Sequence, residues 1–310
     1  MIPENTFHIP VLAAECIEGL SIRPDGHYMD GTMGGGGHSS LILEKLNGGK
    51  LFSFDRDPDA ISECSERFAG RDGIEIIHGN FRDADLLLAG KIEGLDGALL
   101  DLGVSSHQFD ESDRGFSYSH DGRLDMRMSR DGISAEDIVN GYDLRDLTRI
   151  LRDYGEERYA YEIAKKIVRA REEKRIETTA ELADIVTSAL PPQVRRKHKN
   201  PSKQTFQALR IEVNDELGAL RQGLESIFGL LKPGGRFCVI TFHSLEDRIV
   251  KQYFRSLCEG DRESAEYMIR GGTAGAKAIS ITKKPITASG EELDANRRAH
   301  SAKLRIIEKI

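Results

Sequence analysis

Residues 28–38, Tyr28-Met-Asp-Gly-Thr-Met-Gly-Gly-Gly-Gly-His38, decide the fold class of this chain. The first three residues are typical of the end of a buried strand, and Ser39–Leu46 has the length of a helix. The stretch from Asp30 to His38 is therefore predicted to be a strand-to-helix turn. Glycines in such a turn let the backbone adopt positive φ and approach a ligand, and the next helix points N–H groups at it. A plain structural turn would carry the same pattern, so the turn alone leaves both interpretations open.

Apolar runs of strand length recur on both sides of this turn, separated by helix-length segments such as Pro58–Phe68. Strands that alternate with helices predict βαβ units, hence an α/β fold with a mostly parallel sheet and helices on both faces. A helix with an apolar stripe from Leu217 to Leu231 is expected to end at the turn Lys232-Pro-Gly-Gly235. The predicted strands after the first are Lys50–Asp55, Ile74–His78, Gly97–Leu102, Phe237–Phe242, Ala278–Thr282 and Leu304–Ile310.

The alternation stops between residues 113 and 203, where amphipathic helices are predicted and no convincing strand. Leu144, Leu147, Ile150 and Leu151 recur at helical spacing there. The chain is therefore predicted to contain one α/β domain, residues 1–112 and 204–310, interrupted by a helical insertion, residues 113–203.

Composition excludes several classes of protein. The 310 residues are 39% hydrophobic and 31% charged, as in globular chains, with no apolar run long enough to span a bilayer and no visible secretory signal. These features predict a cytoplasmic protein without a membrane partner. The net charge of −7 means that a nucleic acid would have to meet a local basic surface. The four scattered cysteines favour buried thiols, and no metal site is expected.

Asp55 strengthens the ligand-binding interpretation of the glycine turn. It ends the second predicted strand nineteen residues after Gly36, where a carboxylate can accept both hydroxyl hydrogens of a ribose. The alternative role, an N-cap for the helix at Pro58, suits Asp57 better. A dinucleotide and S-adenosylmethionine would both fit. The segment Leu231-Lys-Pro-Gly-Gly-Arg-Phe resembles the turn before the fifth strand of Rossmann-like methyltransferases, which favours S-adenosylmethionine over a dehydrogenase cofactor.

Two residues at predicted strand ends are candidates for catalysis. Asp101 begins Asp101-Leu-Gly-Val-Ser-Ser-His-Gln108 after the fourth strand, where amino-group methyltransferases hold the target nitrogen, although the following residues depart from their Asp/Asn-Pro-Pro-aromatic loop. His243 follows the fifth strand, before a predicted capping box of Ser244 and Asp247. A structural aspartate and a buried loop histidine are the alternatives.

Nucleic-acid contacts are predicted at the end of the insertion. Gln204, Gln207 and Arg210 share a helix face beside Phe206, as base-edge hydrogen bonding and stacking would require, although a solvated face is the alternative. A loop with Arg195, Arg196, Lys197 and Lys203, together with the basic helix Lys165–Arg175, could form a phosphate-binding face.

Long motifs along the whole chain resemble the RsmH (formerly MraW) family of bacterial 16S ribosomal RNA cytosine-N4 methyltransferases. Departures are small: Gly35 and Met33 stand where relatives often carry Arg and Phe, and Glu259–Lys277 is hard to align and expected to be a loop. Besides the glycine turn, the matching motifs are His8-Ile-Pro-Val-Leu12, Phe54-Asp-Arg-Asp-Pro58, His78-Gly-Asn-Phe81, Asp101-Leu-Gly-Val-Ser-Ser106, Arg114-Gly-Phe-Ser117, Leu124-Asp-Met-Arg127, Tyr154-Gly-Glu-Glu157, Thr205-Phe-Gln-Ala208 and Phe242-His-Ser-Leu-Glu-Asp-Arg-Ile-Val-Lys251.

The resemblance implies a cofactor, a substrate and a set of site residues. The target would be a cytidine in the decoding region of 16S rRNA in the small ribosomal subunit, recognised by the helical insertion, and a homodimer is left open. The residues that the resemblance places against S-adenosylmethionine are Gly36, Gly37, His38, Asp55, Phe81, Asp101 and Gln108.

Direct transfer to the exocyclic N4 amine is favoured over methylation at C5. The C5 route needs a cysteine nucleophile, and no cysteine is predicted on a loop at the strand ends. Asp101 would accept the hydrogen bond of the amine or anchor the cofactor beside it. Two other functions stay open: a methyltransferase acting on another RNA, a protein or a small molecule, and a non-catalytic ribosome-assembly factor.

Overall fold

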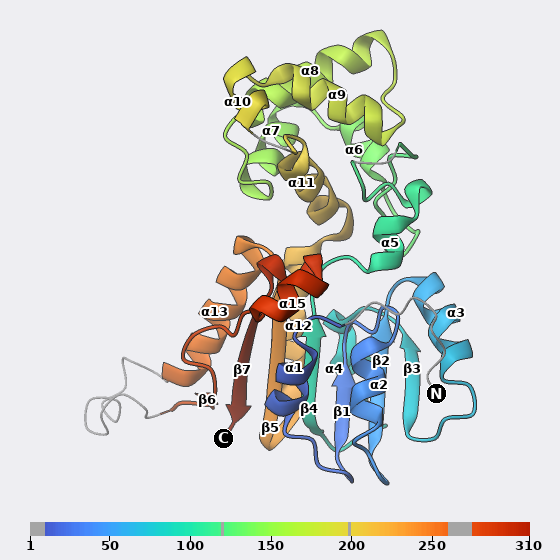
Figure 1. The fold of residues 1–310 in the computed structure, drawn as a ribbon, viewed down its shortest axis with the longest axis vertical. Helices are drawn as coiled ribbons and strands as arrows, with labels where there is room; N and C mark the ends of the chain where they lie inside the picture. The colour runs from blue at the N-terminus through green and yellow to red at the C-terminus, as the bar shows by residue number, and fades with distance from the viewer. Residues whose placement is uncertain (1–9, 119–120, 198–199, 260–274) are drawn as a thin grey trace. The chain divides into compact units, whose positions relative to one another are not determined.

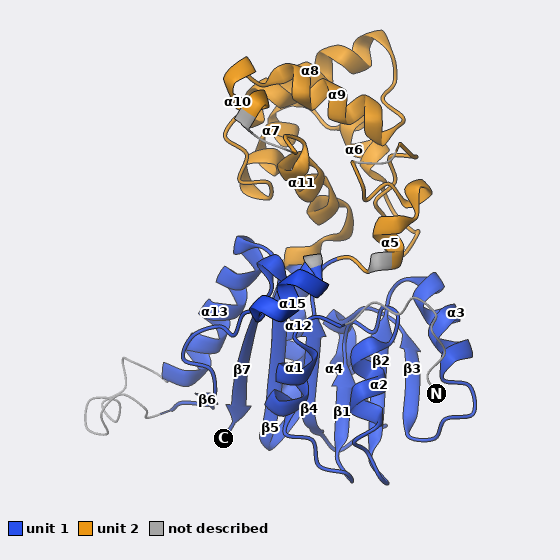
Figure 2. Ribbon diagram, viewed as in Figure 1, with its two compact units in different colours: residues 1–103, 218–310 blue, residues 104–217 orange. Residues whose placement is uncertain are grey.

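The computed structural model describes residues 10–118, 121–197, 200–259 and 275–310 (Figure 1). The chain divides into two compact units (Figure 2): residues 1–103 and 218–310 form the sheet unit, and residues 104–217 form the helical unit. Two spans that the sequence analysis placed in the α/β domain, residues 104–112 and 204–217, thus belong to the helical unit. No described helix is long and apolar enough to cross a membrane.

A seven-stranded sheet organises the sheet unit, in the order β3-β2-β1-β4-β5-β7-β6. The pairs among β1 to β5 are parallel, and β7 runs antiparallel to both β5 and β6. The predicted, mostly parallel sheet is therefore confirmed. Its strands are β1 (His27–Asp30), β2 (Lys50–Asp55), β3 (Ile74–His78), β4 (Leu95–Asp101), β5 (Leu231–Thr241), β6 (Ala278–Ser280) and β7 (Lys303–Lys309).

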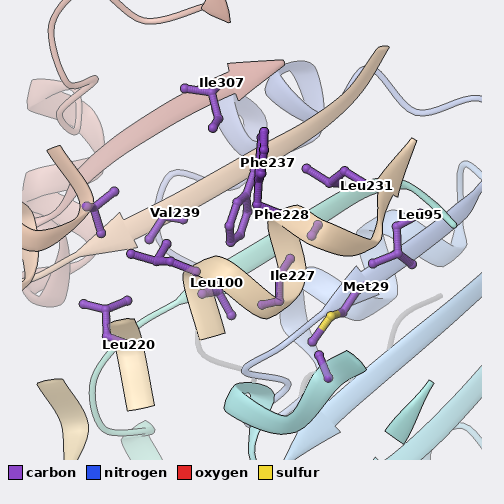
Figure 3. Packing of buried hydrophobic residues seen from close by; sticks show 14 of the residues in the cluster. Met29, Leu95, Leu100, Leu220, Ile227, Phe228, Leu231, Phe237, Val239 and Ile307 are labelled. Atoms are coloured by element: carbon purple, nitrogen blue, oxygen red, sulfur yellow. The ribbon is translucent and has the colours of Figure 1, made fainter. Parts of the chain in front are cut away.

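Helices cover both faces of this sheet because its strands are apolar on both sides (Figure 1). One core contains Met29, Leu100 and Phe237, packed against α12 and α13 (Figure 3). The alternating residues Tyr28 and Leu99 face the other core, against α1, α2 and α3. The helices of this unit are α1 (Ala13–Leu20), α2 (Gly37–Leu43), α3 (Pro58–Arg67), η1 (Phe81–Asp83), α4 (Ala84–Leu87), α12 (Glu216–Leu230), α13 (Ser244–Glu259), α15 (Gly290–Ala295) and η3 (Arg297–Ser301).

The segment before the fifth strand differs from its prediction. The sequence analysis expected the helix to include Leu231 and the Lys232–Gly235 segment to be a turn, whereas α12 ends at Leu230 and β5 already begins at Leu231. Leu231 pairs with Leu95 of β4 across a shift in register, which extends the strand through the glycines. Gly234 supplies the positive φ of 79° inside this irregular stretch.

The helical unit has its own core. Apolar residues such as Leu147, Ile163 and Phe206 are buried in it. Among the described residues of this unit, β pairing is limited to an isolated bridge between Arg123 and Thr178. Arg195, Arg196 and Lys197 lie in α10, which corrects the predicted loop. The helices are α5 (Ser106–Asp110), η2 (Ser112–Arg114), α6 (Ala135–Gly141), α7 (Leu144–Asp153), α8 (Ala160–Glu173), α9 (Thr179–Ala189), α10 (Pro192–Lys197) and α11 (Lys203–Asn214).

Several of the long motifs meet in a buried polar cluster of this unit. The Asn214 amide donates to the Met126 carbonyl at 2.7 Å, and its Oδ1 accepts from Met128 N at 2.9 Å. The buried Arg114 guanidinium donates to the carbonyls of Arg127 and Met128, each at 3.0 Å. Arg114, Met126, Met128 and Asn214 are buried, so their polar groups need partners. The cluster explains these motifs as the means of holding residues 124–128 against α11.

Candidate active site

The glycine turn is fixed to three neighbouring strands by backbone and side-chain hydrogen bonds. Gly31 N donates to Leu99 O of β4 at 2.9 Å, and Met33 N donates to Phe54 O of β2 at 2.8 Å. Thr32 Oγ1 accepts from the backbone N–H of Asp101 at 2.6 Å. The turn therefore lies at the carboxyl ends of β1, β2 and β4, the edge where open α/β sheets bind ligands.

Two of the predicted cofactor-binding glycines have steric reasons to lack a side chain. Gly36 has a φ of 75°, and a Cβ there would lie 2.8 Å from the Phe68 ring. A Cβ on Gly37 would lie 3.3 Å from Pro10. Packing of the turn thus requires glycine at position 36, whether or not a ligand is bound, while at position 37 a side chain would press on Pro10.

Asp55, the predicted ribose-binding residue, also holds the turn. Its Oδ2 accepts from Gly34 N and its Oδ1 from Asp57 N, both at 2.8 Å. Burial raises the pKa of its carboxyl, while these backbone N–H groups oppose the increase. Asp57 is the N-cap of α3, accepting from Asp59 N at 3.1 Å, which confirms that assignment. Each Asp55 oxygen retains acceptor capacity toward a hydroxyl group.

Asp101 and His38 form a buried pair at the end of β4. His38 Nε2 lies 3.7 Å from Asp101 Oδ2, and the two side chains are 5% and 17% exposed. Asp101 Oδ1 makes no hydrogen bond with any described residue, whereas His38 interacts with the backbone of Val11. A buried polar atom without a partner costs about 1–3 kcal/mol. An unpartnered carboxyl oxygen at this edge indicates a site that a bound polar molecule completes.

The charges around this pair determine its protonation. Burial raises the pKa of Asp101 to about 7; the Arg298 guanidinium opposes this increase and the Glu246 carboxylate adds to it. Burial lowers the pKa of His38, and the Asp30 carboxylate acts against that decrease. Near neutral pH the pair is therefore a neutral imidazole beside a carboxyl group close to its midpoint of titration.

Asp30 is a buried carboxylate that accepts hydrogen bonds from the glycine turn and from α2. It is fully buried at the end of β1, and its carboxylate accepts from Ser39 Oγ at 2.7 Å and from Thr32 N at 3.2 Å. Sequence reasoning passed over Asp30, Arg298 and Glu246. The position of Asp30 at the start of the glycine turn could have indicated its role. Arg298 and Glu246 come from distant parts of the chain.

His243 caps the start of α13. Its Nδ1 accepts from Glu246 N at 3.4 Å, and Glu246 Oε2 accepts from His243 N at 3.2 Å. This reciprocal pair is a capping box with His243 at the N-cap. The predicted box of Ser244 and Asp247 is therefore wrong by one residue. Asp247 instead binds Arg305 Nε at 2.8 Å.

Phe81 and Gln108 also have structural contacts. A Cβ on Gly223 of α12 would lie 2.4 Å from the Phe81 ring, so Phe81 packs closely against that helix. Gln108 lies in the helical unit, where its Oε1 accepts from Ser105 N at 3.0 Å in a capping box that starts α5. These contacts account for both residues without a ligand, and they leave the expected cofactor contacts untested.

The cysteines offer no nucleophile near this edge. Cys16 lies in α1, Cys64 in α3, Cys238 in β5 and Cys258 near the end of α13, so none lies on a loop at the strand ends, as predicted. Burial raises the pKa of Cys64 and of Cys238 to about 12 and raises that of the other two. Thiolate is the nucleophilic form, so these thiols are inert near neutral pH.

The α11 residues expected to contact bases are largely engaged within the helical unit. Phe206 is 4% exposed and packs edge-on against Tyr118, with ring centroids 5.6 Å apart, so it presents no exposed stacking face. Gln207 donates to Tyr154 O at 3.0 Å and Gln204 to Glu156 O at 3.4 Å. Arg210 forms a bidentate pair with Glu216, at 2.8 and 2.9 Å.

The predicted basic surfaces divide into exposed and paired cations. Arg195, Arg196 and Lys203 are exposed, while nothing is described of the Lys197 side chain. In α8, Lys165, Lys166 and Arg169 are exposed. At the end of that helix Lys174 pairs with Glu181, Arg175 Nε lies 2.7 Å from Glu136 Oε1, and Arg171 donates to Val139 O.

The strand order, with antiparallel β7 between β5 and β6, and the glycine turn after β1 define a class I Rossmann-like methyltransferase domain. The model of the MraW methylase family matches residues 5–310, and the chain belongs to this family. The family that the sequence motifs indicated is thus confirmed.

Two relatives in sequence agree with this assignment, and solved structures are similar to the chain. The chain is 48% identical over 311 residues to "Ribosomal RNA small subunit methyltransferase H" of Heliobacterium modesticaldum, covering 98% of each chain. It is 47% identical to the protein of that name from Clostridioides difficile, covering 98% of this chain and 99% of the relative. A solved structure of a putative rRNA methylase from Clostridium thermocellum matches 98% of this chain and 100% of its own, at 12% identity and a TM-score of 0.45.

Proposed function

We propose that this chain transfers a methyl group from S-adenosylmethionine to the N4 amine of a cytidine in the decoding region of 16S rRNA. Membership of the MraW methylase family and the names of its relatives support methyl transfer to small-subunit RNA. The observation that carries the N4 assignment is the buried, unpartnered Oδ1 of Asp101 at the ligand-binding edge of the sheet.

The residues at this edge fit the proposed cofactor. The turn around Gly36 and Gly37 brings backbone close to the edge, Asp55 has acceptor capacity for a ribose, and the buried His38 ring lies beside Asp101. Phe81 and Gln108 join this set on the family resemblance. Bound S-adenosylmethionine would supply an electrophilic methyl group on a sulfonium sulfur, so the chemistry asks for no metal.

Asp101 supplies a hydrogen-bond acceptor for the target amine. The lone pair of a cytosine N4 amine is delocalised into the ring, so the nitrogen becomes nucleophilic when an acceptor binds its hydrogens and orients it. Asp101 would accept a hydrogen bond from the amine and take the proton that N4 releases when the methyl group passes to it, the methyl–sulfur bond breaking to leave a neutral thioether. A carboxyl with a pKa of about 7 suits this task near neutral pH. The base must leave its stack to reach the residue.

The cysteines support N4 over C5 as the target atom. Methylation at C5 requires a thiolate that adds to the ring. The four thiols lie in helices or within a strand, and burial raises the pKa of each. None of the four thiols is therefore ionised for addition to the ring.

Nucleoside analysis tests the proposal directly. Purified chain, isotopically labelled S-adenosylmethionine and small ribosomal subunits from a strain lacking the enzyme are combined, and the digested RNA is analysed by mass spectrometry. We expect label in N4-methylcytidine, in a fragment of the decoding region. Label in 5-methylcytidine, in protein, or in no RNA nucleoside would overturn the assignment.

A further inference from the structure

Helix α8 carries an exposed row of three residues that the fold does not use. The helix buries Ala160, Ile163 and Ile167 in the core of the helical unit. Tyr161, Lys165 and Arg169 lie four residues apart on its exposed surface, so their side chains are neighbours along one line. We call these three the α8 row.

Tyr161 and Phe109 are the two exposed aromatic side chains among the described Phe and Tyr residues of the helical unit, and Phe109 is 42% exposed. The Tyr161 side chain is 51% exposed, whereas the neighbouring Tyr159 is partly buried and lies under the Arg158 guanidinium, 5.8 Å from the ring centroid. No hydrogen bond or ring contact joins Tyr161 to another described residue. A flat amphipathic ring left in water in this way is suited to a partner that supplies a second flat surface.

The two cations of the row are also unpaired. In the described part of the chain, no acidic side chain lies within ion-pair distance of Lys165 or Arg169. The cations at the end of the same helix differ, because Lys174 pairs with Glu181 and Arg175 with Glu136. Exposed Glu162, Glu172 and Glu173 lie three or four residues from these cations on the same helix, but none forms an ion pair with them. In a chain of net charge −7, two exposed cations without a direct ion-pair partner, beside an exposed ring, form a local site for an anion.

We propose that the α8 row contacts single-stranded RNA, with Tyr161 stacked on an unpaired base and Lys165 and Arg169 on the phosphates beside it. Single strands expose the faces of their bases, and proteins bind them by combining aromatic stacking with cations along the backbone. An acidic protein surface would use the two cations but not the face of the ring. The inference rests on the proposed function insofar as RNA is the substrate.

The absence of tryptophan from the sequence provides a direct probe. A Tyr161→Trp variant places a single fluorophore in the row, and we expect its emission to be quenched when a single-stranded oligoribonucleotide of decoding-region sequence is added. Ile279→Trp is the matched control, because Ile279 is 50% exposed on β6 of the sheet unit. Equal quenching of both variants, or equal quenching of Tyr161→Trp by duplex RNA, would overturn the proposal.

Affinity and its salt dependence test the three side chains separately. Tyr161→Ala should weaken binding of the oligoribonucleotide about five- to hundredfold, while Tyr161→Phe, which keeps the stacking face, should bind like the wild type. The double variant Lys165→Glu/Arg169→Glu should reduce the slope of log affinity against log salt by about 1.4, since each phosphate contact contributes about 0.7. Lys45→Glu/Arg71→Glu makes the same charge change at exposed cations of the sheet unit and should leave the slope unchanged.

The outcomes separate this inference from the proposed function. If the wild type forms N4-methylcytidine and the Tyr161→Ala and charge-reversal variants bind RNA as it does, the α8 row is excluded while the activity stands. If the wild type methylates no cytidine but the row variants lose RNA binding as predicted, the interaction surface stands and the reaction assignment fails.

Discussion

At the scale of single residues, Asp101 shows what a sequence can and cannot disclose. Its place after an apolar strand predicted a carboxylate at the ligand-binding edge, and the structure places it there. Its protonation depends on burial and on Arg298 and Glu246, which come from two other elements. No local pattern links these residues, so the unpartnered oxygen and the raised pKa could not be predicted from the sequence.

Asp101→Ala should lower the rate of methyl transfer at least tenfold, because the amine loses its acceptor while the turn keeps its backbone hydrogen bonds. Single-turnover transfer to small subunits measures the rate, and circular dichroism checks the fold. An unchanged rate in a folded variant would remove Asp101 from the reaction.

The raised pKa of Asp101 also predicts how stability depends on pH. The unfolded chain releases this proton near pH 4, whereas the folded chain keeps it to about pH 7. Between these values the folded state binds more protons, so stability falls as pH rises. We expect the stability of the wild type relative to Asp101→Asn to fall by up to about 4 kcal/mol from pH 4 to pH 8. Chemical denaturation at several pH values measures the difference; parallel curves for the two proteins would contradict the prediction.

At the scale of elements, patterns predicted which segments are helices and strands better than they predicted side-chain contacts. The α13 helix was expected, but two overlapping capping boxes fit its sequence, one starting at Ser244 and one at His243. Because β5 ends at Thr241, the helix begins with the box of His243. Similarly, Gln204 and Gln207 bind carbonyls that follow α7. That pairing depends on how α11 packs against α7, which a helical period alone cannot specify.

Two substitutions at His243 separate capping from catalysis. His243→Ala should destabilise the protein by about 1 kcal/mol, because the start of α13 loses its cap, whereas asparagine is a good N-cap and His243→Asn should be nearly neutral. Thermal unfolding measures both. If His243 also contacts substrate, His243→Asn will lose transfer activity while it keeps its stability; full activity would limit His243 to the cap.

Gly155 tests the contact between α7 and α11. A Cβ there would lie 2.6 Å from Leu151 O and 2.7 Å from Gln204 O, both of which are backbone atoms. Gly155→Ala should therefore destabilise the helical unit by about 1–3 kcal/mol. Gly141→Ala is the control, because a Cβ at Gly141 meets nothing within 4 Å. Equal denaturation midpoints for the two variants would refute the close approach.

At the scale of the whole molecule, the chain order of strands and helices predicted both units but not their exact borders. The change from alternating strands to helices marks the insertion, whereas α5 and α11 look like ordinary helices of either unit. Their assignment follows from packing: Phe206 and Leu209 of α11 lie in the core of the helical unit. Burial partners of this kind are long-range contacts that composition does not reveal.

The helical unit should fold alone, because residues 104–217 are one continuous segment with its own buried core. We expect a fragment of these residues to be helical and to unfold cooperatively on heating. Circular dichroism and calorimetry measure this. A fragment without a cooperative transition would show that its core depends on the rest of the chain.

The same chain order has a consequence for synthesis on the ribosome. About 130 residues separate the end of β4 from the start of β5, its neighbour in the sheet. At about 5–20 residues per second, the nascent β4 waits roughly 6–26 s with one edge unpaired, while the helical unit emerges and can complete its folding. An unpaired edge is prone to aggregation. The insertion therefore prolongs the interval in which the half-made sheet is most exposed to misassembly.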